Sequence, residues 1–302
     1  MSREAKTNFI LFIIVIILSL ITWLQPGLHQ PIINYLSSLK SDEIKTIIIE
    51  RQDIGQIKLT KKQNGWFMQE PYQLPANRLR VDTITALAEK RSYGQFQVND
   101  NELTRYQLDK PQIAIWLNES KFIIGSDDPI SQQRYAMNID ENIHSGKNTI
   151  HMINGTVFYQ LRASLDTFIS PDLLPAQAAI KSISWSDKKL TINNGHWQLS
   201  PDNPEISADS IAQFIQFWKK AQASRVETNV SLDIDNSELV QSKIISIQLS
   251  ESDHSKAPID YLIIQDGKQI KLLRTDIKIA YWITPQMLKL LTAFIPVQQT
   301  SS

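Results

Sequence analysis

The first long apolar segment of the chain runs from Phe9 to Leu24 and contains no charged residue. Ser19 and Thr22 are its only polar side chains. A helix of this composition is apolar on every side, which is typical of a transmembrane segment. It would be about 24 Å long, somewhat less than a hydrocarbon core of roughly 30 Å. The predicted membrane-anchoring side chains are Phe9, Ile13, Ile17, Leu20, Trp23 and Leu24.

Two other interpretations fit this segment less well. A cleaved signal peptide has a shorter apolar stretch followed by a small-x-small cleavage site, and the residues after Trp23 offer no such site. A buried core helix would carry a polar side. An uncleaved anchor is therefore expected. Arg3 and Lys6 precede the segment, whereas the first basic residue after it is Lys40. This asymmetry predicts a cytoplasmic N-terminus and a periplasmic bulk, in a single-pass protein of a bacterial inner membrane.

Beyond this segment, one order of apolar and polar positions occurs twice, about 130 residues apart. Each copy has a β-branched run, at residues 44–50 and 180–185, and then an alternating run, an Asn-Gly pair, a tryptophan and a proline. Asn-Gly favours the positive φ angles of a tight turn, so each copy predicts a β-hairpin. The repeat signature is Gly65, Trp66 and Pro71, and then Gly195, Trp197 and Pro201. The tryptophans are one position out of step, which predicts that His196 is a local insertion.

A short amphipathic helix is expected after each hairpin. Apolar residues at i, i+3, i+4 and i+7 form a stripe that predicts packing on a sheet. The stripes are Val81, Ile84, Thr85 and Ala88, and then Ile211, Phe214, Ile215 and Trp218. Asn77 and Ser207 precede the stripes and are predicted N-caps. An exposed aromatic ligand surface at Phe214 and Trp218 is the alternative.

Further alternating runs predict four more strands and a closing helix in each copy. They lie at residues 113–117, 122–124, 135–139 and 149–153 with a helix near 156–164, and at 244–249, 261–264, 270–274 and 279–283 with a helix near 285–294. Asp266-Gly267 predicts a two-residue turn between two of them. Because the runs are short and hairpin-linked, the expected class is α+β, with two tandem, mostly antiparallel domains.

The predicted organisation has five parts. They are a cytoplasmic tip and transmembrane helix at 1–27, a juxtamembrane segment at 28–40, repeat domains at 41–175 and 176–296, and a disordered tail at 297–302. Ile32, Ile33, Leu36 and Leu39 predict a short helix in the juxtamembrane segment. The residues from Pro171 to Ala176 are the expected boundary between the domains.

These features, taken in order, resemble a bacterial family described as domain of unknown function 4340. The resemblance rests on the anchor, the strand at 44–50, Gly65-Trp66 with Pro71, the segment from Pro75, and the segment from Leu165 to Pro175. It covers most of residues 40–175 and, more faintly, the second half. It implies an envelope protein without an assigned activity or transferable catalytic residues. Similar domains occur beside, or joined to, components of gliding-type ABC transport systems.

The amino-acid composition limits the classes of partner that are expected for this chain. Lys+Arg and Asp+Glu both number 31, so the basic surplus that phosphate binding needs is missing, and no nucleic acid is expected as a partner. The chain has no cysteine, which excludes disulfides, thiolate catalysis, cysteine zinc sites and a lipid-modified cysteine. Its stability must come from packing and hydrogen bonds.

No pattern predicts a catalytic residue, a cofactor or a metal site. The histidines lack the spacing of zinc ligands and are interpreted as exposed loop residues. They are His29, His144, His151, His196 and His254. The acidic pairs Asp127/Asp128 and Asp140/Glu141 are expected to form turns. The segment from Asp233 to Asn236 resembles the start of a calcium loop but lacks the later glycine and glutamate.

The expected function is therefore a non-enzymatic accessory or scaffold subunit of an envelope or ABC-transport-associated complex, with the lipid bilayer and other envelope proteins as partners. The alternative is a periplasmic module that binds glycan, lipid or peptide in a cleft between the repeats. A deep apolar pocket would favour that alternative, and a solid contact would disfavour it. A hydrolase assembled from distant residues is a third hypothesis, which requires His with Asp or Ser in a cleft.

Overall fold

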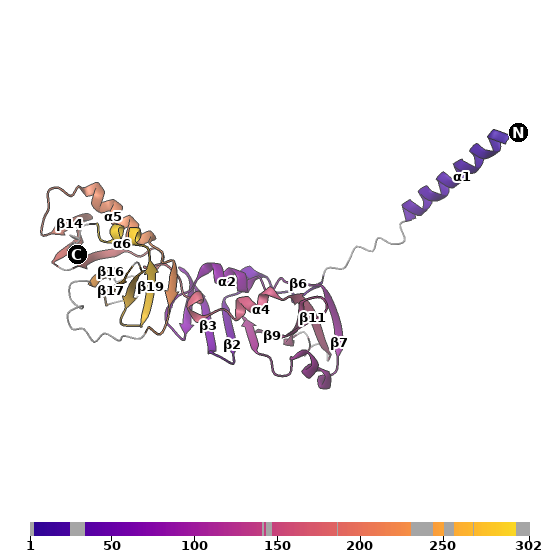
Figure 1. The fold of residues 1–302 in the computed structure, drawn as a ribbon, viewed down its shortest axis with the longest axis horizontal. Helices are drawn as coiled ribbons and strands as arrows, with labels where there is room; N and C mark the ends of the chain where they lie inside the picture. The colour runs from indigo at the N-terminus through magenta and orange to yellow at the C-terminus, as the bar shows by residue number, and fades with distance from the viewer. Residues whose placement is uncertain are drawn as a thin grey trace. The chain divides into compact units, whose positions relative to one another are not determined.

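The computed structural model describes residues 3–24, 34–140, 142, 147–185, 187–230, 244–250, 257–267 and 269–293. The chain divides into two compact units, Met1–Asn34 and Tyr35–Ser302. The first unit contains helix α1 (Arg3–Leu24), and the second contains the β-sheets and the remaining helices (Figure 1). The predicted α+β class, with an N-terminal apolar helix and mostly antiparallel sheets, is confirmed.

The first large sheet has nine strands in the order β5-β4-β3-β2-β8-β9-β10-β11-β7. Its strands are β2 (Thr46–Arg51), β3 (Gly55–Lys62), β4 (Gly65–Glu70), β5 (Leu74–Pro75), β7 (Gly94–Val98), β8 (Ile113–Leu117), β9 (Ser120–Asp127), β10 (Gln133–Asn138) and β11 (Asn148–Asn154). Every neighbouring pair is antiparallel. Helices α2 (Arg78–Thr85) and α4 (Thr156–Leu161) and the 3-10 helices η1 (Ser41–Glu43), η2 (Asp100–Tyr106) and η3 (Leu165–Phe168) belong to the same half of the chain.

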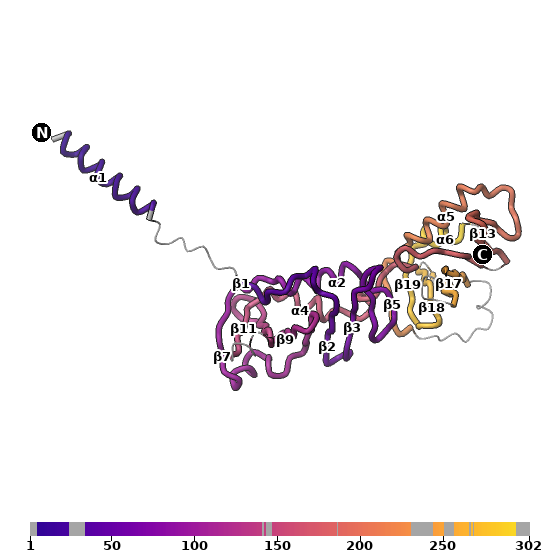
Figure 2. The backbone as a smooth tube through the Cα atoms, turned by 180° about the vertical axis from the view of Figure 1, so that it is seen from behind, coloured from indigo at the N-terminus to yellow at the C-terminus, as the bar shows by residue number. Residues whose placement is uncertain are grey.

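The second large sheet has eight strands in the order β14-β13-β12-β16-β17-β18-β19-β15. Its strands are β12 (Ile180–Trp185), β13 (Lys188–Asn193), β14 (His196–Ser200), β15 (Arg225–Glu227), β16 (Ile244–Leu249), β17 (Ile259–Asp266), β18 (Gln269–Arg274) and β19 (Ile279–Ile283). Helices α5 (Ala208–Lys220) and α6 (Pro285–Leu291) lie side by side (Figure 1 and Figure 2).

The two sheets follow the same strand order. Strands β2 to β4 take the places of β12 to β14, β8 to β11 those of β16 to β19, and β7 that of β15. Different orders would have refuted an internal repeat, so the topology agrees with that prediction. One difference stands out: β5 has no counterpart among the described residues of the second sheet.

The register of the two hairpins corrects one prediction. Gly65 pairs with Lys62, and His196 pairs with Asn193, so these residues occupy equivalent positions and His196 is not an insertion. The extra residue lies in β4 instead. The pairing there shifts between Lys58 and Leu59, which leaves Gln69 in a bulge, whereas β14 pairs without a shift. The two tryptophans are therefore structurally equivalent.

The predicted turn residues are right in one hairpin out of three. Asn194 and Gly195 have φ angles of 50° and 81° and form the expected turn. In the first copy, by contrast, Gly65 is already the first residue of β4, with φ 116°. Asp266 pairs with Gln269, so that turn begins at Gly267, one residue later than predicted. A dipeptide pattern predicts a turn but does not fix its register.

The amphipathic stripes of α2 and α5 face the sheets. Asn77 accepts a hydrogen bond from the Arg80 amide and Ser207 accepts one from the Ser210 amide, so both predicted N-caps are confirmed. The stripe residues are buried, and Trp218 is fully so. The alternative of an exposed aromatic surface at Phe214 and Trp218 is therefore wrong.

The opposite face of the first sheet is covered by the connection from β7 to β8, which contains η2. Leu108 from this connection is buried with Ile123 and Met137 of the sheet. The rings of Phe96, Tyr106 and Tyr135 complete the layer, with Tyr106 4.8 Å from Tyr135. Strand β7 and η2 were not predicted, because β7 has only two large apolar residues, Phe96 and Val98, and η2 has no regular apolar stripe. The part of the first sheet formed by β7 to β11 thus has apolar side chains packed on both faces, whereas β2 and β3 alternate between buried and more exposed positions.

The residues that follow the membrane segment do not form the predicted juxtamembrane helix where they are described. Strand β1 (Asn34–Tyr35) pairs with β6 (Arg91–Ser92), and the Leu36 amide donates to the Lys90 carbonyl at 2.9 Å. Leu36 is fully buried in the main core. Burial of this one leucine in the first sheet's core replaces the expected amphipathic helix. Ile32, Ile33 and the predicted tail at 297–302 lie outside the described residues.

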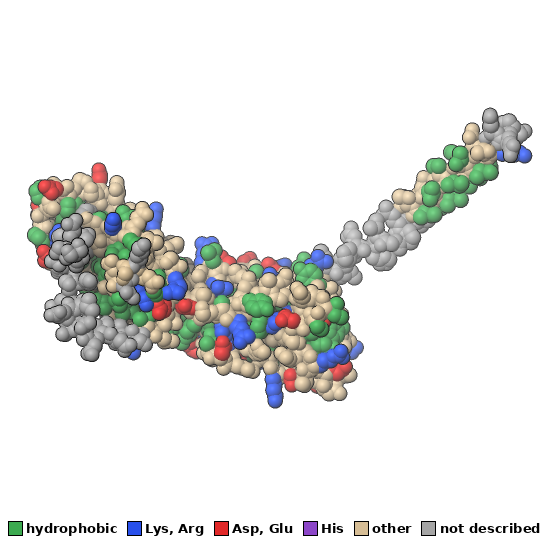
Figure 3. All heavy atoms as spheres, in the orientation of Figure 1, with side chains coloured by type: hydrophobic (Ala, Val, Ile, Leu, Met, Phe, Trp, Pro, Cys, Tyr) green, Lys and Arg blue, Asp and Glu red, His purple; other side chains and the backbone are tan. Residues whose placement is uncertain are grey.

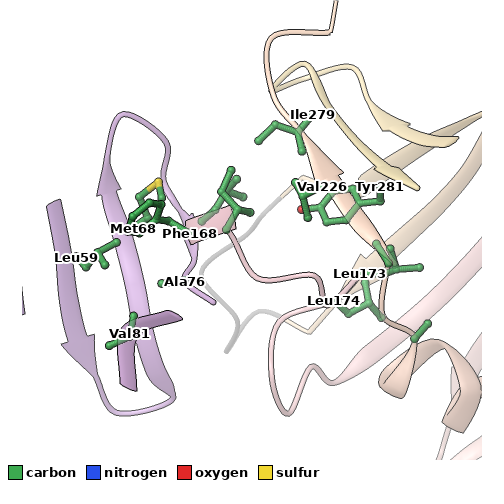
Figure 4. Close-up of a cluster of buried hydrophobic side chains, with 14 of the residues drawn as sticks. Leu59, Met68, Ala76, Val81, Phe168, Leu173, Leu174, Val226, Ile279 and Tyr281 are labelled. Atoms are coloured by element: carbon green, nitrogen blue, oxygen red, sulfur yellow. The ribbon is translucent and has the colours of Figure 1, made fainter. Parts of the chain in front are cut away.

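One apolar core continues from the first sheet into the second. It includes Phe168 of η3, Leu173 and Leu174 of the connection, and Val226 and Tyr281 of the second sheet (Figure 4). Backbone hydrogen bonds reinforce this joint. The Leu173 amide donates to the Ala221 carbonyl at 3.0 Å, and the Ala223 amide donates to the Pro171 carbonyl at 2.8 Å. The predicted domain boundary at 171–176 is therefore a packed segment.

The hydroxyl of Tyr261 donates to the Leu173 carbonyl inside this joint. Tyr261 is fully buried, and burial raises the pKa of its hydroxyl well above the usual range. Burial likewise raises the pKa of Tyr281 to about 12. Both hydroxyls are therefore neutral donors at neutral pH, and the joint depends on packing and neutral hydrogen bonds rather than on charge.

We expect Tyr261→Phe to lower the free energy of unfolding by about 1–3 kcal/mol, because the Leu173 carbonyl loses its donor in a buried place. Chemical denaturation followed by tryptophan fluorescence measures the change. Tyr159→Phe is the control, since Tyr159 is 67% exposed and should shift the value by less than about 0.5 kcal/mol. Equal unfolding midpoints for the two variants would contradict a contribution of this hydroxyl to the joint.

Candidate functional site

Helix α1 is longer than the apolar run alone. It has 22 residues, and its segment Ala5–Trp23 has a mean hydropathy of 2.2. The helix starts at Arg3, so its full length of about 33 Å includes the charged residues Arg3, Glu4 and Lys6. The candidate span Ala5–Trp23, which itself includes Lys6, is about 28 Å long, close to a hydrocarbon core of roughly 30 Å.

The predicted anchoring side chains lie within about 120° on one side of α1, and Leu11, Ile14 and Leu18 make the opposite side apolar as well. Phe9, Ile13, Ile17, Leu20 and Trp23 are between 41% and 85% exposed, and hydrophobic side chains cover the helix in Figure 3. Leu24 is the last helical residue, and its side chain is outside the described set. Thr22 donates its hydroxyl to the Leu18 carbonyl at 2.8 Å, which satisfies this polar group within the helix. A membrane anchor and a signal sequence both have these properties.

The tryptophans and prolines of the repeat signature lie in matching places, whereas Gly65 matches His196 and Gly195 lies in the preceding turn. Trp66 and Trp197 are half-buried and pair with Lys61 and Ile192 of the neighbouring strands. Pro71 and Pro201 directly follow β4 and β14. Gly65 and Gly195 have positive φ angles, and a Cβ at either would meet no atom within 4 Å, so conformation and not space favours glycine there. These six residues lie in two separate hairpins, and their role as a signature of the repeat stays a prediction.

The histidine prediction is wrong for one of the two described histidines. His151 lies in β11 and is only 1% exposed, because it is on the side of the strand that faces the main core, together with Ile153 and opposite Ala136 of β10. His196 is exposed, although it lies at the start of β14 and not in a loop. His29, His144 and His254 lie outside the described residues. Within the described ranges, no three His, Asp or Glu side chains are grouped so that they could hold a metal ion.

The acidic pair Asp127/Asp128 has the structural role that was expected. Asp128 accepts hydrogen bonds from the amide and hydroxyl of Ser131 at 2.8 and 2.6 Å and from the Tyr135 hydroxyl at 2.9 Å. These bonds hold the pKa of Asp128 below its usual range. Asp127 accepts from Arg134. Glu141 and the calcium-like segment from Asp233 to Asn236 lie outside the described residues.

Two buried arginines connect α4 to the first sheet through hydrogen bonds and a cation–π contact. Arg51 donates to the carbonyls of Leu161 and Ala163 at the end of α4, at 3.3 and 2.5 Å, and pairs with Asp53 at 2.6 Å. Its hydrogen bond holds the pKa of the Asp53 carboxyl below its usual range. Arg134 lies 3.6 Å from the ring centre of Phe158 of α4. Both guanidinium groups are committed to structural contacts, which gives them no catalytic opportunity.

A second polar cluster lies on the outer part of the second sheet. Glu227 accepts from the indole nitrogen of Trp282 at 2.7 Å and forms an ion pair with Lys271 at 3.2 Å. Arg225 and Lys271 each lie 4.3 Å from the ring centre of Trp282. Burial raises the pKa of Glu227, but the bonds from Trp282 and Lys271 outweigh it and the net shift is downward. A carboxylate that is ionised and fully paired is a poor general acid.

None of these clusters was predicted from the sequence. Each is assembled from strands that are distant in the chain, and its members lie in runs with no spacing pattern of their own. Arg51 and Asp53 are the exception, because a charged residue inside the β-branched run of β2 is unusual enough to suggest a buried partner.

The joint between the repeats is filled rather than hollow. Its core is continuous, and the Gln222 amide donates to the Asp172 carboxylate at 2.7 Å beside it. Tyr72 at the outer side donates to Asn229 at 2.9 Å. A solid contact of this kind disfavours the cleft that a ligand-binding module between the repeats would need.

Comparison with known proteins gives one result. No curated protein and no solved structure matches the chain significantly. A family described as "Domain of unknown function (DUF4340)" matches residues 66–243. The match begins at the tryptophan of the first hairpin and reaches into the second repeat, so it overlaps the expected resemblance, which covered most of residues 40–175 and, more faintly, the second half. Because the match covers more than half of the 302 residues, the chain belongs to the family of domain of unknown function DUF4340.

Proposed function

We propose that this chain is a single-pass protein of a bacterial inner membrane, with α1 as an uncleaved anchor and the β-sheet unit in the periplasm. It acts as a non-enzymatic accessory or scaffold subunit of an envelope complex. The observation that carries the proposal is the surface of α1. Its apolar segment has no polar side, and none of it is buried. A helix with so long an exposed apolar segment is stable in lipid and not in water.

The orientation follows from the charges at the two ends of α1. Arg3 and Lys6 lie at its start, and no basic residue follows until Lys40. Basic residues are retained on the cytoplasmic side, which places the sheets on the other side.

The accessory role is supported by what the sheets offer. The conspicuous charged groups, Arg51, Arg134 and Glu227, are engaged in structural contacts. Two sheets joined by one apolar core form a stiff body that can hold partners in place. The family resemblance adds a specific context, an ABC-transport-associated complex, as part of the proposal. A module that binds ligand in the joint is less favoured, because that joint is packed with apolar side chains.

The anchor is tested by a charge in the middle of α1. We expect Ile17→Asp to weaken retention of the chain in membranes washed at alkaline pH, because a carboxylate at the bilayer centre costs about 2.5–3.5 kcal/mol. Leu79→Asp is the matched control, since Leu79 is also apolar and exposed but lies in α2. Release of the wild-type chain by the same wash would refute the anchor. If the intact mass of the chain shows that it begins beyond Pro26, the segment is a cleaved signal sequence instead.

The orientation is tested by reporter fusions at the C-terminus. A reporter that is active only in the periplasm should work there, and one that is active only in the cytoplasm should not. Exchanging Arg3 and Lys6 for Glu should reduce the difference, because the flanking charges set the orientation. The opposite pattern for the unchanged chain would overturn the periplasmic placement while leaving the anchor intact.

The scaffold role is tested by purification in a mild detergent after cross-linking in membranes. We expect defined envelope proteins to be recovered with the chain, and to be lost when Ile17→Asp removes it from the membrane. Leu79→Asp again serves as the control with an intact anchor. Recovery of the chain without any other envelope protein, under every cross-linking condition, would count against a scaffold.

A further inference from the structure

The two sheets differ at one edge. In the first sheet, the outer edge of β4 is covered by β5, where Leu74 and Pro75 pair with Met68 and Phe67. The Ala76 amide extends this pairing and donates to the Trp66 carbonyl at 2.9 Å. Leu74 is buried in the core at this edge. The chain thus closes its first sheet with its own segment.

The segment of the second repeat that corresponds to β5 does not pair with β14. Pro204 stands where the first repeat has Leu74, and proline has no amide to donate. The Ile206 amide, at the place of Ala76, donates to the Asn203 carbonyl at 3.1 Å, and the Glu205 amide donates to the Asn203 side chain at 3.1 Å. These bonds form a local turn instead of a strand. Strand β14 is accordingly the last strand of its sheet among the described residues.

The register shows which backbone groups of β14 face outward. Trp197 occupies the position of Trp66, whose carbonyl points to β5. In an antiparallel ladder, inward and outward groups alternate. The amides and carbonyls of Trp197 and Leu199 therefore face the open edge, and those of Gln198 face β13. Within the described ranges, no strand pairs with these outward groups of Trp197 and Leu199.

The side chains of this edge do not protect it against pairing. Natural edge strands usually carry charges or proline. Strand β15 has Arg225 and Glu227 and β5 has Pro75, whereas β14, like β7 at the other edge of the first sheet, has no Lys, Arg, Asp or Glu. Ile192, opposite Trp197, is 37% exposed, and Lys61 stands at its place in the first sheet. The second repeat thus exposes an apolar pair beside an uncharged edge.

We propose that β14 pairs with β14 of a second copy of this chain, antiparallel and with Gln198 at the two-fold axis. Trp197 then lies opposite Leu199 of the other copy. Because both residues have outward-facing groups, the two copies form about four backbone hydrogen bonds in the normal ladder pattern. The strand is its own complement, with an aromatic residue opposite an aliphatic one and no charge to repel the partner.

A second copy suits this edge better than an unrelated peptide. The contact is isologous, so one uncharged strand supplies both sides without any further sequence requirement. Anchoring in one bilayer, which rests on the proposed function, holds copies at a raised effective concentration, so that a short strand pair suffices. The same pairing lengthens the eight-stranded sheet across two chains.

The absence of cysteine makes the register directly testable. Gln198→Cys places two thiols across the axis in a non-hydrogen-bonded pair, about 4.5 Å between Cα atoms, a spacing at which disulfides form. We expect oxidation of membranes containing this variant to give a covalent homodimer. Gln97→Cys is the matched control, because Gln97 is exposed on β7, the other edge strand without charge. It should remain monomeric.

The substitution Gln198→Lys gives an independent test of the proposed pairing. Two ammonium groups across the axis repel each other, so the mass of the detergent-solubilised chain should fall from dimer to monomer, whereas Gln97→Lys should leave it unchanged. A monomeric wild type, or equal cross-linking at positions 198 and 97, would overturn the proposal. A disulfide between the Gln198→Cys variant and a different protein would assign the edge to a foreign strand and would also overturn it. None of these outcomes affects the alkaline-wash test of the anchor.

Discussion

The apolar core that crosses from the first sheet to the second is the interaction on which the rest of the structure depends. Phe168 belongs to the end of the first repeat, and Leu173 and Leu174 belong to the connection, yet all three are buried with residues of the second sheet. Burial of such side chains contributes about 1.5–3 kcal/mol each, which is large against a typical free energy of unfolding. The joint therefore fixes two repeats as one body without any disulfide, and it fills the place where a ligand would otherwise bind.

Much of this fold could be predicted, because its regular elements carry regular patterns. The alternating runs of β8, β16 and β19 fall where the periodicity predicts them, and so do the stripes and caps of α2 and α5. The limits have physical causes. The bulge at Gln69 shifts a register without changing any pattern, and β7 and β15 are recognised only through their partners in the sheet. His151 was misplaced because Thr149 and His151 give their side of β11 a polar pattern, although that side, which also carries Ile153, faces the main core.

The functional features also divide into those that the sequence predicts and those that only the structure shows. The apolar helix α1 could be predicted because its long run without charge is a strong pattern, one that a membrane anchor and a signal sequence share. The contacts of Arg51 and Arg134 with α4 and the cluster around Glu227 could not be predicted from the sequence, since each joins residues that only the folded sheet brings together. A structural use of charge leaves no spacing in the sequence, whereas a metal site or a nucleophile motif does. The sequence could therefore suggest the absence of known motifs, but it could not show what the charged residues do instead.

The comparison between the repeats extends this argument from the core to the surface. Both copies need the same strand order and the same tryptophan in the hairpin, because these contribute to packing against the core. Packing against the core does not determine what lies at the edge of each sheet, and there the two copies differ. The first sheet is closed by Leu74 and Pro75 of β5, and the second ends at β14, an uncharged strand beside Ile192. An open edge without charge or proline is a liability for a protein, because it can pair with the strand of another chain. Such an edge persists most simply where a strand regularly covers it, so the place where the two repeats differ is the place where a partner is most expected.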